Sequence, residues 1–285
     1  MRFQTHHPIF VGVAIQLLAF PSVGAQFTWI CSTNSQRWVD KGTLQSASGK
    51  KSSGRQIEIT ENAFRQEIDG WGGCFNELEW EALSALGTNE RDAVIAALFD
   101  TVTGCALNLC RMPIGANDYA QGYYSLDDHA DDFTMSYFSV ARDSLRLIPF
   151  IKAAMKYRPD LQITASPWCP PTWMMTPVGS QPYVGTIKAT PQIFDAYGLY
   201  LAKFVNAYRA LGINIASVHV QNEPQFNNNN YPQCKWTGAQ MRDFIKGYLG
   251  PQFRKNNVAA EICHGTIWNL WDDGRIPDLG PLFSK

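Results

Sequence analysis

Strand-like and helix-like segments alternate along most of this chain, and the alternation limits the folds that it can adopt. Longer segments with helical signals separate short runs that are apolar or bounded by Gly and Pro. The runs occupy residues 68–76, 105–115, 162–171, 213–220 and 259–265. Such alternation predicts a parallel sheet, and its even pacing favours a (β/α)8 TIM barrel, an α/β fold, over a doubly wound sheet. No glycine-rich nucleotide-binding motif follows any run, which weakens the doubly wound alternative.

The predicted barrel is incomplete, because five strand–helix units cannot close an eight-stranded barrel. We therefore expect residues 68–285 to form a partial TIM barrel that is truncated after about five β/α units. Residues 26–67 are short and β-like, with an exposed loop rich in Gly, Ser and Lys that begins at Gly42. We expect them to form an amino-terminal β segment that belongs to a small side β-sandwich.

Residues 1–25 have the features of a secretory signal peptide. Arg2 precedes an apolar stretch over residues 9–20, and small residues at Gly24 and Ala25 end the segment. An apolar stretch of about a dozen residues is too short to span a bilayer. We therefore expect a secreted mature chain that begins near Gln26 and has no integral membrane span.

Helix signals divide the remaining sequence. Thr88 is the expected N-cap of a helix that follows it, and residues 138–157 have a helical pattern that Pro149 should kink or split. Thr190 and Pro191 start a helix that runs to about Leu211. Thr237 is expected to cap another helix, over residues 238–256.

The composition excludes several classes of function. The formal net charge is −1 and no long block of like charges occurs, so a nucleic-acid partner has no electrostatic support. No Cys-x-x-Cys pair or His cluster suggests a metal site, and we expect no cofactor. The seven cysteines are an odd number, so at least one is unpaired, although Cys169 and Cys234 on loops are able to bridge. Nine Trp and eleven Tyr suit sugar recognition, but an aromatic core gives the same count.

Polar and aromatic groups gather where the predicted strands end. The run LGINIASVHVQNEPQF stops at Pro224, which cannot donate to a sheet and leaves Glu223 at the carboxyl end of a buried strand. Such groups also occur over residues 71–77, 111–118 and 168–173, and all should converge on one face of a barrel. Glycoside hydrolysis needs two carboxylates beside the scissile bond. Glu223 is the predicted general acid/base, with its pKa raised by partial burial and by a second carboxylate nearby.

Five blocks of the sequence resemble glycoside hydrolase family 30, the glucosylceramidase-like and endo-β-1,6-glucanase-like enzymes. In order along the chain, the blocks are GWGGCFNELEWEAL, LNLCRMPIGANDYA, ASPWCPPTWM, VQNEP and RDFIKGYLGP, and the resemblance covers about residues 68–266. The resemblance implies a TIM-barrel catalytic domain with Glu223 as the acid/base. It also implies that Asn222 contacts the sugar 2-hydroxyl, that Asp118 binds hydroxyls of the non-reducing sugar, and that Trp168 is the aromatic wall of the same subsite. Arg111 matches an arginine that supports the nucleophile.

The nucleophile has no clear match. In that family it is a Glu at the end of the seventh barrel strand, which would lie beyond Lys285. Glu261 lies inside a predicted strand, and Glu77 and Glu79 begin a helix. The remaining acidic candidates lie in the turn WDDG, at Asp272 and Asp273. None suits the role, so this chain alone is expected to be inactive.

The resemblance supports one leading hypothesis and leaves others open. The leading hypothesis is a secreted retaining β-glycosidase of the glucosylceramidase type, with a carbohydrate or glycolipid substrate. Endo-β-1,6-glucanase and β-xylosidase activities occur in the same family, and the loop PQFNNNNYPQCKW suits either a pocket or a groove. A hypothesis of another class is a catalytically inactive carbohydrate-binding protein. A purely structural or partner-binding role ranks last.

Overall fold

A computed structural model of the chain describes residues 26–45, 65–224 and 230–266. The chain divides into two compact units, residues 1–66 and 67–285. Within the described residues, no helix is long and apolar enough to cross a membrane. The predicted signal peptide lies outside the described residues.

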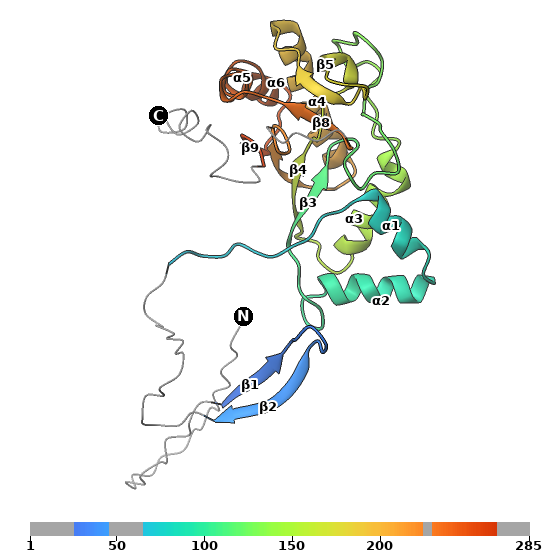
Figure 1. The fold of residues 1–285 in the computed structure, drawn as a ribbon, viewed down its shortest axis with the longest axis vertical. Helices are drawn as coiled ribbons and strands as arrows, with labels where there is room; N and C mark the ends of the chain where they lie inside the picture. The colour runs from blue at the N-terminus through green and yellow to red at the C-terminus, as the bar shows by residue number, and fades with distance from the viewer. Residues whose placement is uncertain (1–25, 46–64, 225–229, 267–285) are drawn as a thin grey trace. The chain divides into compact units, whose positions relative to one another are not determined.

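In the first unit the structure describes an antiparallel hairpin (Figure 1). Its strands are β1 (Gln26–Cys31) and β2 (Val39–Gln45). The exposed loop predicted from Gly42 is wrong at its start, because residues 43–45 pair with β1 in the hairpin. Residues 46–64 of the predicted β segment lie outside the described residues, so the side β-sandwich stays a prediction.

The second unit contains a parallel sheet with the strand order β3-β4-β7-β9. These strands are β3 (Leu109–Pro113), β4 (Gln162–Ser166), β7 (Ile215–His219) and β9 (Glu261–Cys263). Each strand pairs with the next one along the chain, always in parallel. This order never reverses, as it would at the switch point of a doubly wound sheet. The sheet is therefore consistent with part of an α/β barrel.

Successive residues of the sheet face opposite sides. Met112, Ala165 and Val218 lie next to each other in register and are completely buried in the hydrophobic core. Arg111 is the neighbour of Met112, so it points to the other face, beside Thr164. The apolar face packs on the helices, and the polar face with Arg111 leads to the candidate site.

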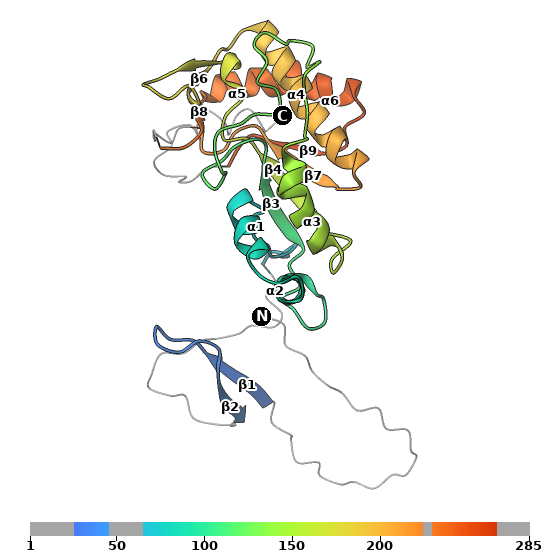
Figure 2. The same ribbon diagram turned by 90° about the vertical axis from the view of Figure 1, so that its right-hand side faces the viewer.

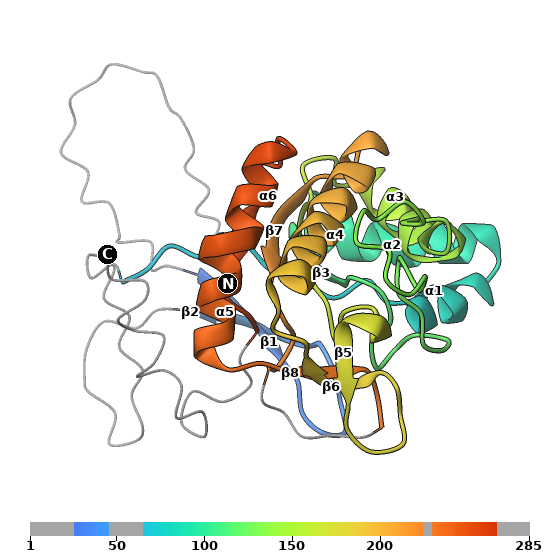
Figure 3. The ribbon, with the colours of Figure 1, turned by 90° about the horizontal axis from the view of Figure 1, so that it is seen from above.

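The second unit also contains helices, and the described helical segments are α1 (Glu77–Ser84), α2 (Thr88–Phe99), η1 (Asp143–Leu145), α3 (Leu147–Met155), η2 (Thr172–Met174), α4 (Pro191–Ala210), α5 (Gly238–Phe244), the π-helical η3 (Ile245–Leu249) and α6 (Gly250–Lys255). In Figure 3, α2, α3, α4 and α6 follow one another along the sheet. The predicted caps of α4 and α5 are confirmed. Thr190 Oγ1 accepts from Ile193 N at 3.3 Å, and Thr237 Oγ1 accepts from Gln240 N at 3.2 Å.

Two helix starts differ from the prediction. α2 already includes Thr88, and its cap is made by Glu90, whose Oε2 accepts from Gly87 N at 3.0 Å. The helix predicted from residue 138 begins only at α3, after the short η1. Pro149 therefore lies in the first turn of α3, where its missing N–H breaks no helical hydrogen bond, and it does not kink the helix.

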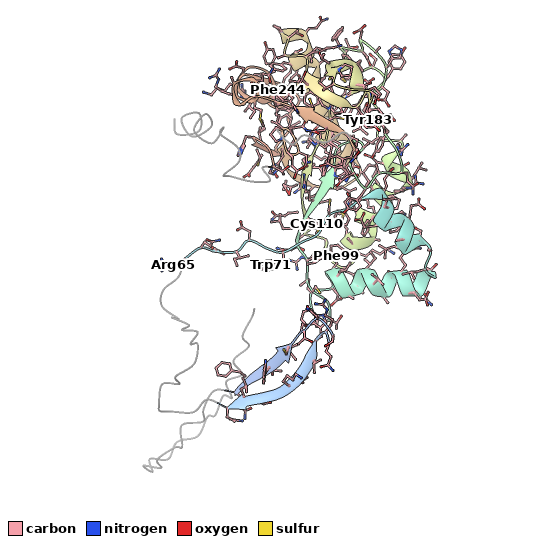
Figure 4. The ribbon with its side chains drawn as sticks, in the orientation of Figure 1. Arg65, Trp71, Phe99, Cys110, Tyr183 and Phe244 are labelled. Carbon is pink, nitrogen blue, oxygen red and sulfur yellow. The ribbon has the colours of Figure 1, made fainter. Side chains whose placement is uncertain are left out.

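The predicted strands are all shorter than expected, as the first two of them illustrate. The run over residues 68–76 forms only an isolated bridge between Cys74 and Arg111, although Trp71 O and Gly73 O also accept hydrogen bonds from the segment of β3. The run over residues 105–115 is a strand only in β3, and Cys105 is exposed. Figure 4 shows Trp71 on the extended segment that leads to this edge of the sheet.

A second, smaller sheet was missed. It contains β5 (Met175–Pro177), β6 (Val184–Ile187) and β8 (Gln233–Lys235), and Figure 2 shows β6 beside β8. The parallel pairing of β6 with β8 ties the segment after β4 to the segment after β7. Cys169 and Cys234 are buried free thiols, so the disulfide that the sequence allowed is absent.

Candidate active site

A pocket of about 240 Å³ opens at the carboxyl ends of β3, β4 and β7. Its walls come from the segments that follow these strands and from the bridge that precedes α1. The pocket is lined by Cys74, Asn76, Arg111, Asn117, Asp118, Tyr119, Trp168, Asn222, Glu223 and Tyr231. All five residues predicted from the sequence to form the site therefore lie around one cavity.

The backbone after β7 holds Glu223 at the pocket. Asn222 N donates to Pro167 O at 2.8 Å, and Glu223 N donates to Thr266 O at 2.9 Å, so the sheet pairing continues beyond the strand. Glu223 has a φ of +42°, in the left-handed region that non-glycine residues adopt at a cost of about 1 kcal/mol. The hydrogen bonds on both neighbouring segments and the following Pro224 hold this conformation. The half-buried side chain of Glu223 is thus turned into the cavity.

Arg111 joins three segments beneath the pocket. Its Nη2 donates to Ser166 Oγ at 2.7 Å, to Asn222 Oδ1 at 2.6 Å and to Thr266 Oγ1 at 3.3 Å. Thr266 Oγ1 also donates to Asn222 Oδ1, at 2.9 Å. Asn222 is buried, so these bonds fix the orientation of its amide and direct the amide nitrogen away from Arg111.

Trp168 closes the pocket beside Arg111. Only 6% of its surface is exposed, and the guanidinium carbon of Arg111 lies 4.5 Å from the centre of its ring. Gln221 Nε2 donates to Trp168 O at 2.6 Å, which ties this segment to the end of β7. The indole is therefore held rigidly by a cation–π contact and by its own backbone.

The charges around Glu223 act in opposite directions. Burial raises the pKa of Glu223 above its usual range, and the negative charge of Asp118 raises it further. The positive charge of Arg111 and a hydrogen bond with Tyr231 lower the same pKa. Burial also raises the pKa of the Cys74 thiol to about 11, so this pocket residue is uncharged near neutral pH. A raised pKa favours the protonated form of a carboxyl group, which is the form that donates a proton.

Some sequence expectations for the site were wrong or incomplete. Trp71 is 66% exposed and Trp173 donates its Nε1–H to Asp127 O, so neither indole lines the pocket. Asn117 and Tyr231 do line it and were not singled out. Asn117 precedes Asp118 directly, and Tyr231 lies in the loop that the sequence suggested as a pocket wall. Among the described residues, no group of three His, Cys, Asp or Glu side chains is placed to hold a metal ion.

Comparison with known proteins gives a family match. The model of the glycosyl hydrolase family 30 TIM-barrel domain matches residues 68–275. Putative glucosylceramidase 3 of Caenorhabditis elegans is 31% identical over 79% of this chain and 44% of its own length. Lysosomal acid glucosylceramidase of Mus musculus is 29% identical over 91% of this chain and 50% of its own length. An endo-1,6-beta-D-glucanase of Neurospora crassa is 26% identical over 90% of this chain and 53% of its own length. The chain thus spans about half the length of these relatives.

A solved structure has the same fold. The endo-beta1,6-glucanase BT3312 superposes with a TM-score of 0.68 at 24% identity. The match covers 76% of this chain and 49% of that protein. At this level of identity the likeness concerns the fold, and it agrees with the parallel sheet described above.

Proposed function

This chain belongs to glycosyl hydrolase family 30, and on that basis we propose that it carries the acid/base half of a retaining β-glycosidase acting on β-glucosides. The observation that carries the proposal is the shared pocket of Glu223, Asp118, Trp168, Asn222 and Arg111. Glu223 protonates the leaving oxygen and then deprotonates a water molecule, a double role that its raised pKa supports. Secretion through a signal peptide at residues 1–25 is part of the same proposal.

The other pocket residues receive binding roles in this proposal. The buried indole of Trp168 offers a flat apolar wall for one sugar ring, and Asp118 accepts hydrogen bonds from the hydroxyls at the far end of that ring. Asn222 presents its amide nitrogen to the 2-hydroxyl, because its oxygen is already occupied by Arg111 and Thr266. Within the family we place the glucosylceramidase type ahead of the endo-β-1,6-glucanase and β-xylosidase alternatives. The named relatives at 31% and 29% identity support this order.

A second carboxylate is required, and we place it outside the described residues. Arg111 is a largely buried cation that forms no ion pair with any carboxylate in the described part of the chain. Its partners are the neutral groups of Ser166, Asn222 and Thr266, so a carboxylate nucleophile above it would be stabilised in its charged form. The acidic candidates Asp272 and Asp273 also lie outside the described residues.

Purified chain is expected to release no 4-nitrophenol from 4-nitrophenyl β-D-glucoside above the level of its Glu223→Gln variant. A retaining mechanism needs two carboxyl groups about 5–5.5 Å apart, and the described residues supply only the acid/base of that pair. Release of the phenol is followed by absorbance. Turnover that Glu223→Gln abolishes would mean that this chain supplies its own nucleophile, and it would contradict the expected inactivity.

Binding separates the glycosidase proposal from a role unrelated to sugars. The chain is expected to bind methyl β-D-glucoside, and Trp168→Ala is expected to weaken binding about tenfold through loss of the aromatic wall. Calorimetric titration measures the affinity. Trp71→Ala is the matched control, because Trp71 is exposed and does not line the pocket. Equal affinities for the two variants would contradict the pocket assignment. Sugar binding by an otherwise complete protein without turnover would favour the carbohydrate-binding alternative.

A further inference from the structure

Asp118 lies on an exposed loop, so its place in the pocket depends on the groups that hold the loop. We define the Asp118 loop as residues 117–121, which follow β3. Three hydrogen bonds join it to the start of α1. Asn117 Nδ2 donates to Asn76 Oδ1 at 2.5 Å, and Leu78 N donates to Tyr119 O at 3.1 Å. Gln121 N donates to Glu77 Oε2 at 2.8 Å.

Glu77 is the charged member of this attachment. Its side chain is 2% exposed, which is rare for a carboxylate unless it is paired. Arg142 is its cation, with Nη2 at 3.2 Å from Oε2 and Nε at 3.3 Å from Oε1. One carboxylate oxygen thus accepts both the loop N–H of Gln121 and the guanidinium. Removal of the carboxylate charge therefore loosens the loop and leaves Arg142 without its counter-ion.

Arg142 also contacts the chain just after the Asp118 loop. Its guanidinium carbon lies 4.1 Å from the centre of the Tyr124 ring. Tyr124 O accepts from Ala116 N at 3.0 Å, a bond that closes the chain just outside the Asp118 loop. The pair therefore contacts the chain after Asp118 at two points, Gln121 and Tyr124, although neither Glu77 nor Arg142 lines the pocket.

We propose that Glu77 and Arg142 are a positioning pair that holds the Asp118 loop at the pocket, and so fixes the distance between Asp118 and Glu223. The importance of that distance for a sugar rests on the proposed function. The positioning itself does not, because it is a statement about two carboxylates in the free protein. A purely structural role, in which Glu77 only joins α1 to the segment of Arg142, is the alternative to be tested.

A neighbouring ion pair is a matched control for that alternative. Glu81, one helical turn after Glu77 on α1, pairs with Arg146, one turn after Arg142. This pair joins the same two segments and makes no contact with the Asp118 loop. Glu81→Gln removes an ion pair between these two segments, one in which the carboxylate is more exposed than that of Glu77, without releasing Asp118.

The test measures the carboxyl titration of Glu223 by NMR in the full chain, with labelled glutamate and with Glu223→Gln to assign the signal. The charged groups that act on Glu223 are Arg111 and Asp118. Asp118→Asn removes a negative charge and is expected to lower the pKa of Glu223 by roughly half a pH unit. Glu77→Ala is expected to lower it in the same direction, because the carboxylate of Asp118 loses its fixed place. Glu81→Gln is expected to leave it unchanged.

The double variant decides between a positioning role and a purely structural role for Glu77. In the Asp118→Asn background, Glu77→Ala is expected to cause no additional change in the pKa of Glu223. An unchanged pKa in Asp118→Asn or in Glu77→Ala, or an equal decrease in both backgrounds, overturns the proposal. If Glu77→Ala does not fold, Glu77→Leu serves in its place, because leucine fills the buried volume and offers no acceptor to Gln121 N. None of these outcomes depends on sugar binding, so the proposed function can fail while this inference stands.

Discussion

Replacing Arg111 with methionine is expected to destabilise the folded chain by about 2–4 kcal/mol. The guanidinium donates to Ser166, Asn222 and Thr266, which lie on three different segments. Its central carbon also lies 4.5 Å from the centre of the Trp168 ring, in a cation–π contact. Methionine fills part of the volume but donates no hydrogen bond, so the acceptors of all three segments lose a partner. Methionine is uncharged, so the variant no longer has to bury a cation, and this offsets part of the lost stability. The expected loss is therefore smaller than the sum of the separate hydrogen bonds.

The same substitution is expected to raise the pKa of Glu223, because the positive charge of Arg111 lowers that pKa in the parent protein. Urea unfolding measures the stability, and a carboxyl titration by NMR measures the pKa. Arg111→Lys is the control that separates the two effects. Lysine keeps the positive charge but not the planar set of N–H donors of the guanidinium. The Arg111→Lys variant should therefore lose stability while the pKa of Glu223 stays near its parent value. An unchanged pKa in Arg111→Met would mean that the two groups do not interact.

The sequence predicts best the features that local patterns determine. The β-branched run before Glu223 is buried on both faces, since Ile213, Ile215, Val218 and Val220 are almost inaccessible. The Thr-Pro start of α4 needs only residues within one turn, and it is confirmed by the capping hydrogen bond of Thr190. Strand ends meet at one face in any parallel sheet, which is why Trp168 and Glu223 were placed together without any knowledge of the loops.

Features that depend on distant pairing were not predictable. β6 and β8 have four and three residues, and they pair across about fifty intervening residues, so neither has a pattern long enough to recognise. Ser166 and Thr266 were missed as partners of Arg111 for a related reason. Ser and Thr are common at strand ends, and only the register of β3 on β4 places the Ser166 hydroxyl within reach of the guanidinium.

A buried carboxylate away from the pocket provides a pH-dependent test of the fold. Asp143 is completely buried, and its two oxygens accept hydrogen bonds from the hydroxyls of Tyr124 at 2.9 Å and Tyr208 at 2.7 Å. Burial is the main cause that raises the pKa of Asp143 to about 6, and the nearby charge of Glu77 adds to it. The two tyrosine hydroxyls and Arg142 act in the other direction. The folded chain therefore binds a proton here that the unfolded chain has already released.

The direction of the pH dependence follows from that difference. Between about pH 4, where the unfolded carboxyl titrates, and about pH 6, the folded state holds more protons than the unfolded state. Asp143 makes its full stabilising contribution to the free energy of unfolding below about pH 4. This contribution falls by about 3 kcal/mol as the pH rises through the window. Asp143 thus stabilises the folded state least at neutral pH, where its buried carboxyl group is charged.

Asp143→Asn is expected to remove this dependence, so that its stability relative to the parent rises by up to about 3 kcal/mol from about pH 4 to about pH 7. Asparagine keeps the shape and one acceptor for a tyrosine hydroxyl but never ionises. Urea unfolding of both proteins across that range measures the difference, in which the titration of all other carboxylates cancels. Tyr208→Phe is the opposing control, because loss of a hydroxyl that lowers the pKa of Asp143 should steepen the decline. A difference between Asp143→Asn and the parent that does not vary with pH would mean that Asp143 stays charged throughout.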